Sequence, residues 1–353
     1  MESEKRDQSL DFLRGIAIFA VVIFHVSLFF GPQHSFYRTL ASQGFLGVQL
    51  FFIVSAITMC RMWDLRRGES SPMAKFYIRR VCRIAGPFWL ALILYGLYLK
   101  PDIFQLITTT LFIHALWPHT INAAIPGGWS IGVEMLFYLC FPVLVKLDLS
   151  PRCYAGAGLA VYIANIIFVR PAYGIAYPDQ DIHEFLYLQF WNQAPVFLIG
   201  MSLSKQLKNG ITDIWSAAVV IIWIALSFVC KFVFGLFGSP FFWIEVFLLT
   251  AFAYTVLQTK SSFEPINYLG RMSYSIYLVH LAIVWTIMAY LGPENASTHW
   301  AFWFAFPVVF LVSTLISILL GRLVEKPSSE VGRAIISRLD HSPPLSKSFA
   351  GES

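Results

Sequence analysis

Long apolar stretches separated by short polar segments run through almost the whole chain. Ten of them have about the length that a ~30 Å hydrocarbon core requires. They fall near residues 11–30, 44–63, 84–100, 131–146, 153–170, 187–204, 213–230, 241–259, 273–291 and 300–322. Residues 103–117 form one more apolar stretch, which is shorter and can be either spanning or re-entrant. The pattern predicts an all-α, polytopic membrane bundle of about ten transmembrane helices.

Lysine and arginine residues cluster at the ends of the apolar stretches, where membrane topology is encoded. If the N-terminus is cytoplasmic and residues 103–117 do not span, 20 of them lie on the cytoplasmic side and 4 on the other. If that segment spans, all later loops change sides and the counts become 11 and 13. The bias therefore predicts that both termini are cytoplasmic and that residues 103–117 are a short re-entrant or interfacial segment.

The composition supports this class and excludes others. Of the 353 residues, 57% are hydrophobic and 13% are charged, whereas soluble domains carry about 25% charged residues. The net charge of +5 reflects topology rather than nucleic-acid binding. The five cysteines lack paired or metal-ligand spacing, so neither a disulfide nor a metal site is predicted. The polar segment 327–353 is expected to be a cytoplasmic tail, partly disordered.

Arg14 and His25 are the most informative pair, because both lie in the first apolar stretch. Eleven residues bring them within about 20° of one helix face and about 16 Å apart along its axis. Ionisable residues in a membrane helix are costly and usually mark a pathway or a site. Arg14 can also simply pair with Asp11, three residues earlier. Taken together, they fit a long ligand with a charged head and a reactive tip.

Two further spanning segments carry ionisable residues. Glu134 is flanked by Trp129 and Tyr138, and a carboxylate in such a helix needs a partner or a proton. Ser273, Tyr277 and His280 are spaced by four and three residues and form one polar stripe. The alternative interpretation of both groups is interhelical hydrogen bonding that only holds the bundle together.

Three arginines, Arg79, Arg80 and Arg83, immediately precede the third predicted helix. The surrounding basic segment is explained by topology and lipid headgroups, but these three can also bind the phosphates of a nucleotide-bearing ligand. Ser55 can be a packing residue, and Glu325 can be an exposed charge at the end of the last helix.

Five segments in order resemble the membrane acyltransferase-3 family. They are LDFLRGIAIFAVVIFH with its Arg-x10-His pattern, GFLGVQLFFIVSAI, FYIRRVCRIAGPFW, WSIGVEMLFYLCFP with Trp-Ser-x-x-x-Glu-x-x-Phe-Tyr, and SYSIYLVH with Ser-Tyr-x-x-Tyr-Leu-x-His. Gln49 and Ala56 depart from the family, which often has Asp and Gly there. No fused esterase-like domain is expected after residue 322. The resemblance makes residues 1–326 a membrane acyltransferase domain.

The resemblance implies acyl transfer, commonly O-acetylation of a bacterial cell-surface or lipid-linked carbohydrate such as lipopolysaccharide, in the cytoplasmic (inner) membrane. Acetyl-coenzyme A is the expected donor. Arg14, Arg79, Arg80 and Arg83 would hold its phosphates, and His25 would act as general base on the acceptor hydroxyl. Glu134 would orient His25 or raise its basicity.

A different class of function uses some of the same residues. A proton-coupled secondary transporter would use His25, Glu134 and His280 as a relay. Transporters often contain internal repeats and paired broken helices, and neither pattern stands out in this sequence. The acyltransferase is therefore the favoured interpretation.

Overall fold

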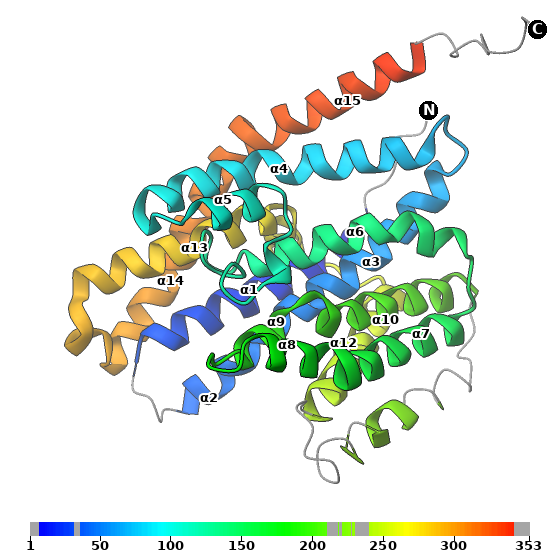
Figure 1. The fold of residues 1–353 in the computed structure, drawn as a ribbon. Coiled ribbons are helices and arrows are strands. Elements are labelled where there is room, and N and C mark those ends of the chain that lie inside the picture. The colour runs from blue at the N-terminus through cyan, green and yellow to red at the C-terminus, as the bar shows by residue number, and fades with distance from the viewer. Residues whose placement is uncertain are drawn as a thin grey trace, which may run out of the picture.

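The computed structural model describes residues 7–31, 36–209, 218, 221–226, 228–229 and 240–341 (Figure 1). Within these ranges the regular structure is helical, and they hold no strand. The α-helices are α1 (Gln8–Phe29), α2 (Phe36–Ser42), α3 (Gly47–Arg66), α4 (Pro72–Leu99), α5 (Ile103–Thr110), α6 (Trp129–Lys146), α7 (Pro151–Ala164), α8 (Arg170–Ala176), α9 (His183–Leu188), α10 (Phe190–Asn209), α12 (Pro240–Gln258), α13 (Glu264–Ala296), α14 (His299–Leu320) and α15 (Lys326–His341).

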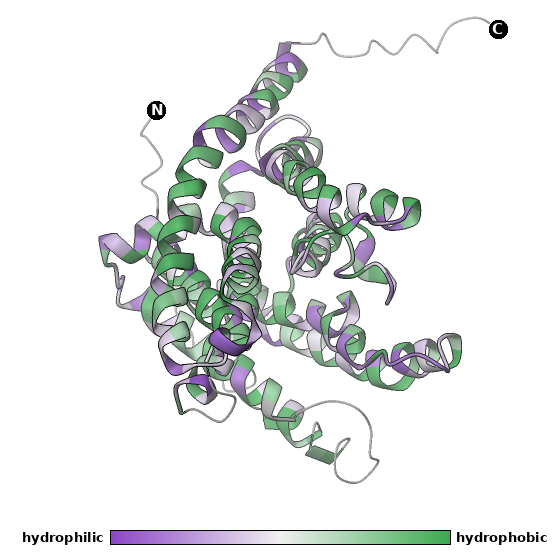
Figure 2. Cartoon of the chain, turned by 90° about the vertical axis from the view of Figure 1, so that its left-hand side faces the viewer, coloured by the Kyte–Doolittle hydropathy of each residue, from purple (hydrophilic) through white to green (hydrophobic). Residues whose placement is uncertain are grey.

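Seven helical segments of the described chain are long and apolar enough to cross a membrane, and α12 is a shorter apolar helix. They confirm a multi-pass, all-helical membrane protein. Figure 2 shows the hydrophobic colour dominating most of the helices. Nine of the ten predicted spans coincide with described helices, although α10 is not among the seven. The tenth, 213–230, lies partly outside the described residues.

Ion pairs gather at one end of the bundle, which we call the Asp7 end. Asp7, at the start of α1, pairs with Arg61 near the end of α3. Lys75, near the start of α4, pairs with Asp340 on the last helix. The start of the first described helix and the end of the last one therefore lie at the same end of the bundle.

Residues 103–117 do not form one continuous helix. Helix α5 is only eight residues long and begins with a capping box between Asp102 and Gln105. It ends where Phe112 takes a positive φ of 61° and the N–H of Ile113 donates to the carbonyl of Thr108 (2.9 Å). This is the hydrogen-bond pattern of a Schellman stop. An eight-residue helix is about 12 Å long, so α5 is too short to span.

Helix α1 packs against both α13 and α3, and its crossing with α13 depends on two glycines. A Cβ on Gly15 would lie 2.0 Å from the carbonyl oxygen of Ile266. A Cβ on Gly270 would lie 1.8 Å from the carbonyl oxygen of Asp11. Because no side chain fits at either position, the two backbones come into direct contact. This contact sets the depth and rotation of every polar residue on the two helices.

Two predicted boundaries differ from the structure. Helix α4 begins at Pro72, twelve residues before the predicted span, because the helix continues through its polar, arginine-bearing first turns. The predicted tail 327–353 is helical as far as His341, and α15 packs along this extension of α4. Ser328 donates a hydrogen bond to the carbonyl of Cys82 there. Residues 342–353 lie outside the described residues, so disorder there stays a prediction.

Candidate active site

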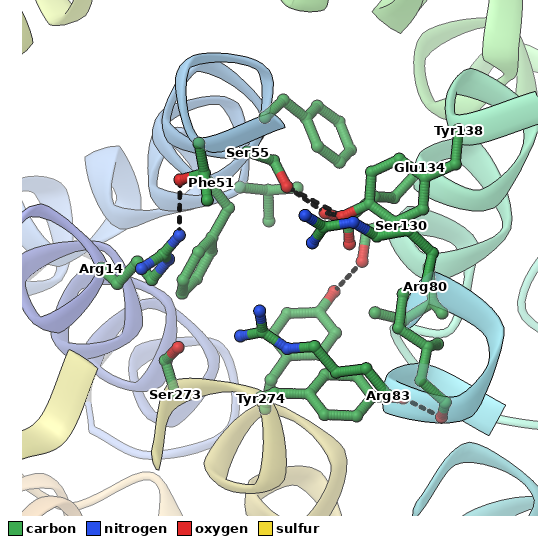
Figure 3. Close-up of a pocket in the computed structure, with 16 residues that line it drawn as sticks. Arg14, Phe51, Ser55, Arg80, Arg83, Ser130, Glu134, Tyr138, Ser273 and Tyr274 are labelled. Atoms are coloured by element: carbon green, nitrogen blue, oxygen red, sulfur yellow. Dashed lines mark hydrogen bonds between the residues drawn. The ribbon is translucent and has the colours of Figure 1, made fainter. Parts of the chain in front are cut away.

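A pocket between α1, α3, α4, α6 and α13 collects most of the predicted site residues (Figure 3). Its empty volume is about 780 Å³, including the part that opens to the surface. Three arginines and one carboxylate line it, together with hydroxyl and apolar groups. The predicted residues in the lining are Arg14, Ser55, Arg80, Arg83, Glu134, Tyr138, Ser273 and Tyr277. We call it the arginine pocket.

Arg14 enters the arginine pocket from α1. Its Nη2 donates to Thr58 Oγ1 on α3 (2.6 Å), and its Nη1 lies 3.3 Å from Asp11 Oδ1. The Asp11 pair that the sequence allowed therefore exists, and Arg14 lines the pocket as well. The two contacts fix the guanidinium at the α1–α3 boundary, so its position does not depend on a bound ligand.

Arg80 and Arg83 enter the same pocket from α4. The Cζ of Arg80 lies 5.7 Å from the ring centre of Phe76 and 5.5 Å from that of Tyr138. Its Nε is buried and has no hydrogen-bond partner within the described residues. Arg83 is exposed. A buried guanidinium donor without a partner is costly, and an anionic ligand would satisfy it.

Arg79, which the sequence grouped with these two, does not line the arginine pocket. Its Nη2 lies 2.5 Å from Glu69 Oε2, in an ion pair beside the start of α4. Neighbouring residues on a helix point about 100° apart, so Arg79 and Arg80 face different surroundings. Arg79 is therefore a natural control for the two arginines in the pocket.

Glu134 forms a compact cluster with two hydroxyl groups. Ser55 Oγ and Tyr138 OH both donate hydrogen bonds to Glu134 Oε1, and the two hydroxyl oxygens are 3.0 Å apart. Ser130, Glu134 and Tyr138 are spaced by four residues, so they share the face of α6 that lines the pocket. The carboxylate faces the three arginines and offsets part of their charge.

The expected contact between Glu134 and His25 is absent from the described structure, and His25 instead contacts His280. His280 Nε2 lies 3.1 Å from His25 Nδ1, which is also 2.9 Å from the carbonyl oxygen of Val21. His280 is fully buried, whereas His25 is partly exposed. His25 and His280, which lie on separate helices, thus form one pair. Glu134 belongs to the arginine pocket instead.

Tyr277 stands between the arginine pocket and the histidine pair. It lines the pocket, and its ring centre lies 5.7 Å from that of His280. Its hydroxyl donates to the carbonyl of Gly127 (2.8 Å) and accepts from Ser130 Oγ (2.8 Å). Neither histidine belongs to the pocket lining. The pocket and the pair are therefore adjacent but separate.

The remaining predicted residues lie around the pocket. Trp129 is buried against Phe52, with the ring centres 6.0 Å apart, and does not line the pocket. Glu325 accepts a hydrogen bond from Ser275 Oγ. It ends the π-helix Gly321–Glu325 and is only partly exposed. It is therefore not the exposed helix-end charge that the sequence allowed.

Three polar lining residues were not predicted: Thr58, Ser130 and Tyr274. Ser130 could have been found, because it lies four residues before Glu134 on the same helix face. Tyr274 is the second residue of the SYSIYLVH segment, so the family pattern contained it although no role was assigned to it. Thr58 carried no such signal. The hydroxyl of Tyr274 donates to the carbonyl of Ile84 (2.8 Å), a contact between distant helices that no local spacing reveals.

Comparison with known proteins now places the chain. The acyltransferase-3 family model, described as an acyltransferase domain, matches residues 7–322. The chain belongs to this family. No solved structure matches it.

The chain is similar to two curated relatives. The peptidoglycan O-acetyltransferase OatA of Listeria monocytogenes is 23% identical over 324 residues, which cover 80% of this chain and 50% of the relative. The O-acetyltransferase OatA of Staphylococcus aureus (strain NCTC 8325 / PS 47) is 22% identical over 369 residues, covering 94% and 58%. The chain thus spans about half the length of these relatives.

Proposed function

We propose that this protein is an integral membrane O-acetyltransferase. It would move an acetyl group from acetyl-coenzyme A to a hydroxyl of a cell-surface or lipid-linked carbohydrate, in a bacterial cytoplasmic (inner) membrane. The observation that carries the proposal is the convergence of Arg14, Arg80 and Arg83 on one pocket beside the His25–His280 pair. Family membership and the names of the two relatives support the reaction class.

The arginine pocket suits the phosphate end of the donor. Planar guanidinium groups bind phosphate through paired, charge-assisted hydrogen bonds, and Arg80 has a buried N–H without a partner in the described residues. The pocket takes side chains from the first turns of α1 and α4, near the Asp7 end. The charge bias of the loops predicts that this end is cytoplasmic, which is where acetyl-coenzyme A is available.

The donor would have to connect the two regions. Arg14 and His25 lie on one helix, about 16 Å apart along its axis. We propose that the phosphates rest on the arginines while the thin arm passes Tyr277 and brings its thioester to His25. Glu134 compensates the arginine cluster and fixes the Ser55 and Tyr138 hydroxyls, instead of acting on His25.

The chemistry at His25 is direct general-base transfer. The neutral imidazole takes the proton of the acceptor hydroxyl while its oxygen attacks the thioester carbonyl. An O–C bond forms and the C–S bond breaks, and the departing sulfur receives the proton from the imidazolium. The products are the O-acetyl ester and free coenzyme A, so no additional reactant is needed.

The acceptor that we propose is a carbohydrate. One relative is named a peptidoglycan O-acetyltransferase, and lipopolysaccharide or another surface glycan uses the same hydroxyl chemistry. A proton relay through His25, Glu134 and His280 is not supported, because Glu134 contacts neither histidine in the described chain.

The test is transfer of labelled acetyl groups in vesicles that contain the purified protein, with mass spectrometry of surface glycans from cells with and without it. We expect acetylated glycan to be absent from cells that lack the protein and from cells that carry His25→Ala. Unchanged glycan acetylation in cells lacking the protein, together with no transfer in vesicles, would overturn the proposal.

A further inference from the structure

The hydrogen bonds around His280 determine which of its nitrogens carries the proton. His280 is fully buried. Its Nδ1 lies 2.7 Å from the carbonyl oxygen of Tyr277 and 3.3 Å from that of Ile276. A carbonyl oxygen only accepts hydrogen bonds, so Nδ1 must carry the hydrogen. In a neutral imidazole the second nitrogen, Nε2, then presents a lone pair.

The same reasoning extends to His25. Its Nδ1 faces two acceptors, the carbonyl oxygen of Val21 (2.9 Å) and the Nε2 lone pair of His280 (3.1 Å). Nδ1 of His25 must therefore be a donor as well. If His280 instead donated from Nε2, His25 Nδ1 would turn a lone pair toward the Val21 carbonyl, which is repulsive. The contacts form a one-directional chain from His25 through His280 to the Tyr277 carbonyl.

The other nitrogen of His25 remains open. Within the described residues, Nε2 of His25 has no hydrogen-bond partner, and it is not among the buried polar atoms that lack one. His25 is also the partly exposed member of the pair. The arrangement leaves one accessible, basic nitrogen at the end of a fixed chain of hydrogen bonds.

We propose that His280 is a positioning residue that holds His25 in its Nδ1–H tautomer, so that Nε2 of His25 removes the acceptor proton. This inference rests on the proposed function. When Nε2 takes the proton, Nδ1–H already points at two acceptors, and these stabilise the imidazolium without any rearrangement. Nε2 then returns the proton to the departing sulfur. A carboxylate plays the corresponding part in Ser-His-Asp triads; here the partner is a neutral imidazole.

The backbone supports this pairing directly. The Gly15–Gly270 contact brings α1 and α13 together ten residues before each histidine, and both helices continue in the same direction to His25 and His280. His280 accepts from His25 through a side chain that is itself fixed by two carbonyls of its own helix. The rotation of the His25 ring is thereby set from both helices.

The test reads the tautomer without substrate. Protein labelled with 15N-histidine, in lipid nanodiscs, is examined by NMR, and the His25 signals are assigned by their loss in His25→Ala. We expect a pyrrole-type signal from Nδ1 and a pyridine-type signal from Nε2. In His280→Leu only the Val21 carbonyl still accepts from Nδ1, so the Nδ1–H tautomer should lose population without disappearing. Turnover should fall about tenfold or more, up to the roughly 10²–10⁴-fold that general-base catalysis contributes, with coenzyme A affinity unchanged.

A conservative variant and a matched control separate positioning from folding. His280→Gln keeps an acceptor oxygen near the Nε2 position, so it should restore both the tautomer and most of the turnover. His114 is also buried and bonded to a carbonyl, that of Gly128 (2.9 Å). His114→Leu should lower thermal stability but leave the His25 tautomer unchanged.

The outcomes distinguish this inference from the function. An Nε2–H tautomer of His25 in a protein that transfers acetyl groups overturns the inference alone, as does His280→Leu with an unchanged tautomer and full turnover. No acetyl transfer by the wild-type protein overturns the proposed function and the catalytic half of the inference together.

Discussion

The arginine pocket and the histidine pair share helices α1 and α13 but satisfy their polar groups in opposite ways. In the pocket, the Arg80 guanidinium keeps a buried N–H without a partner in the described chain. In the pair, His280 has both ring nitrogens bonded, and His25 has one. The pocket therefore offers a hydrogen-bond donor without a partner to a ligand, whereas the pair is complete apart from a single nitrogen.

Under the proposed function, this difference separates donor binding from chemistry along one helix. Under this proposal, the arginines that line the pocket contribute to donor affinity, and the histidine pair contributes to the rate. Tyr277, which contacts both regions, marks the boundary between them. Substitutions on the two sides should therefore change different measured quantities.

The largest effect is expected at His25. His25→Ala removes the nitrogen that we propose accepts the hydroxyl proton, so acetyl turnover should fall by about 10²-fold or more. Coenzyme A affinity and expression should stay near wild type, because the arginine pocket is intact. Wild-type glycan acetylation in cells carrying His25→Ala would end the general-base assignment.

Next in size are the pocket arginines. Arg14→Lys and Arg80→Lys lose planar, multi-donor contacts, and hydrogen bonds to charged groups are worth about 1.5–3 kcal/mol. Calorimetry on purified protein should show coenzyme A affinity weakened about tenfold to a hundredfold. Arg79→Lys is the matched control and should bind normally, since Arg79 pairs with Glu69 outside the pocket. Equal losses at all three positions would indicate a general charge effect.

Substitution at the contact between Gly15 on α1 and Gly270 on α13 tests whether the arginine pocket and the histidine pair depend on one backbone contact. A Cβ at position 270 would lie 1.8 Å from a carbonyl oxygen, so Gly270→Ala should cost about 1–3 kcal/mol of stability. Turnover should fall too, because the helices must separate. Gly156→Ala, where nothing lies within 4 Å of the added atom, should leave both unchanged. Normal thermal stability in Gly270→Ala would contradict the crossing.

Glu134 is expected to act within the pocket. Glu134→Gln keeps an acceptor oxygen for Ser55 and Tyr138 but removes the charge that compensates Arg80. The ligand-free melting temperature should fall by about 2–4 °C, and coenzyme A should raise it by more than in wild type. Thermal scans with and without coenzyme A measure both. An unchanged melting temperature with lost turnover would return Glu134 to the chemistry at His25.

The smallest effect lies at the surface, far from both regions. The hydrogen bond from Lys205 lowers the pKa of the Asp148 carboxyl from its usual range. The stabilisation is present above the usual carboxyl range and disappears as pH falls through the lowered pKa. Asp148 is 77% exposed, so Asp148→Asn should cost less than about 1 kcal/mol. Asp179 is exposed and forms no ion pair within the described residues, so Asp179→Asn is the control. Activity should not change in either variant.

The sequence predicts well whatever lies within one helix. Arg14 and His25 are related by helical geometry alone, and Glu134 and Tyr138 by a spacing of four. The contact between His25 and His280 could not be predicted, because it depends on how α1 and α13 cross. For the same reason Glu134 was assigned to the wrong partner.

The sequence also fails where a helix continues beyond the apolar layer. The first turns of α4 and the whole of α15 mix polar residues with scattered apolar ones, so hydropathy marks them as a loop and a tail, yet they pack against each other. Their stability comes from tertiary contact rather than from an apolar run. Hydropathy left residues 103–117 either spanning or re-entrant, and the bias of the basic residues favoured the short segment; the Schellman stop at Phe112 explains how the chain turns.

The most direct test of the separation between binding and chemistry is a double-mutant cycle on α1. Coenzyme A affinity and single-turnover acetyl transfer are measured on the same preparations of wild type, Arg14→Lys, His25→Ala and the double variant. We predict that Arg14→Lys changes the affinity alone and His25→Ala the rate alone. The effects should add within about 0.5 kcal/mol, as for distant sites. Weakened donor affinity in His25→Ala, or strong non-additivity, would contradict the account.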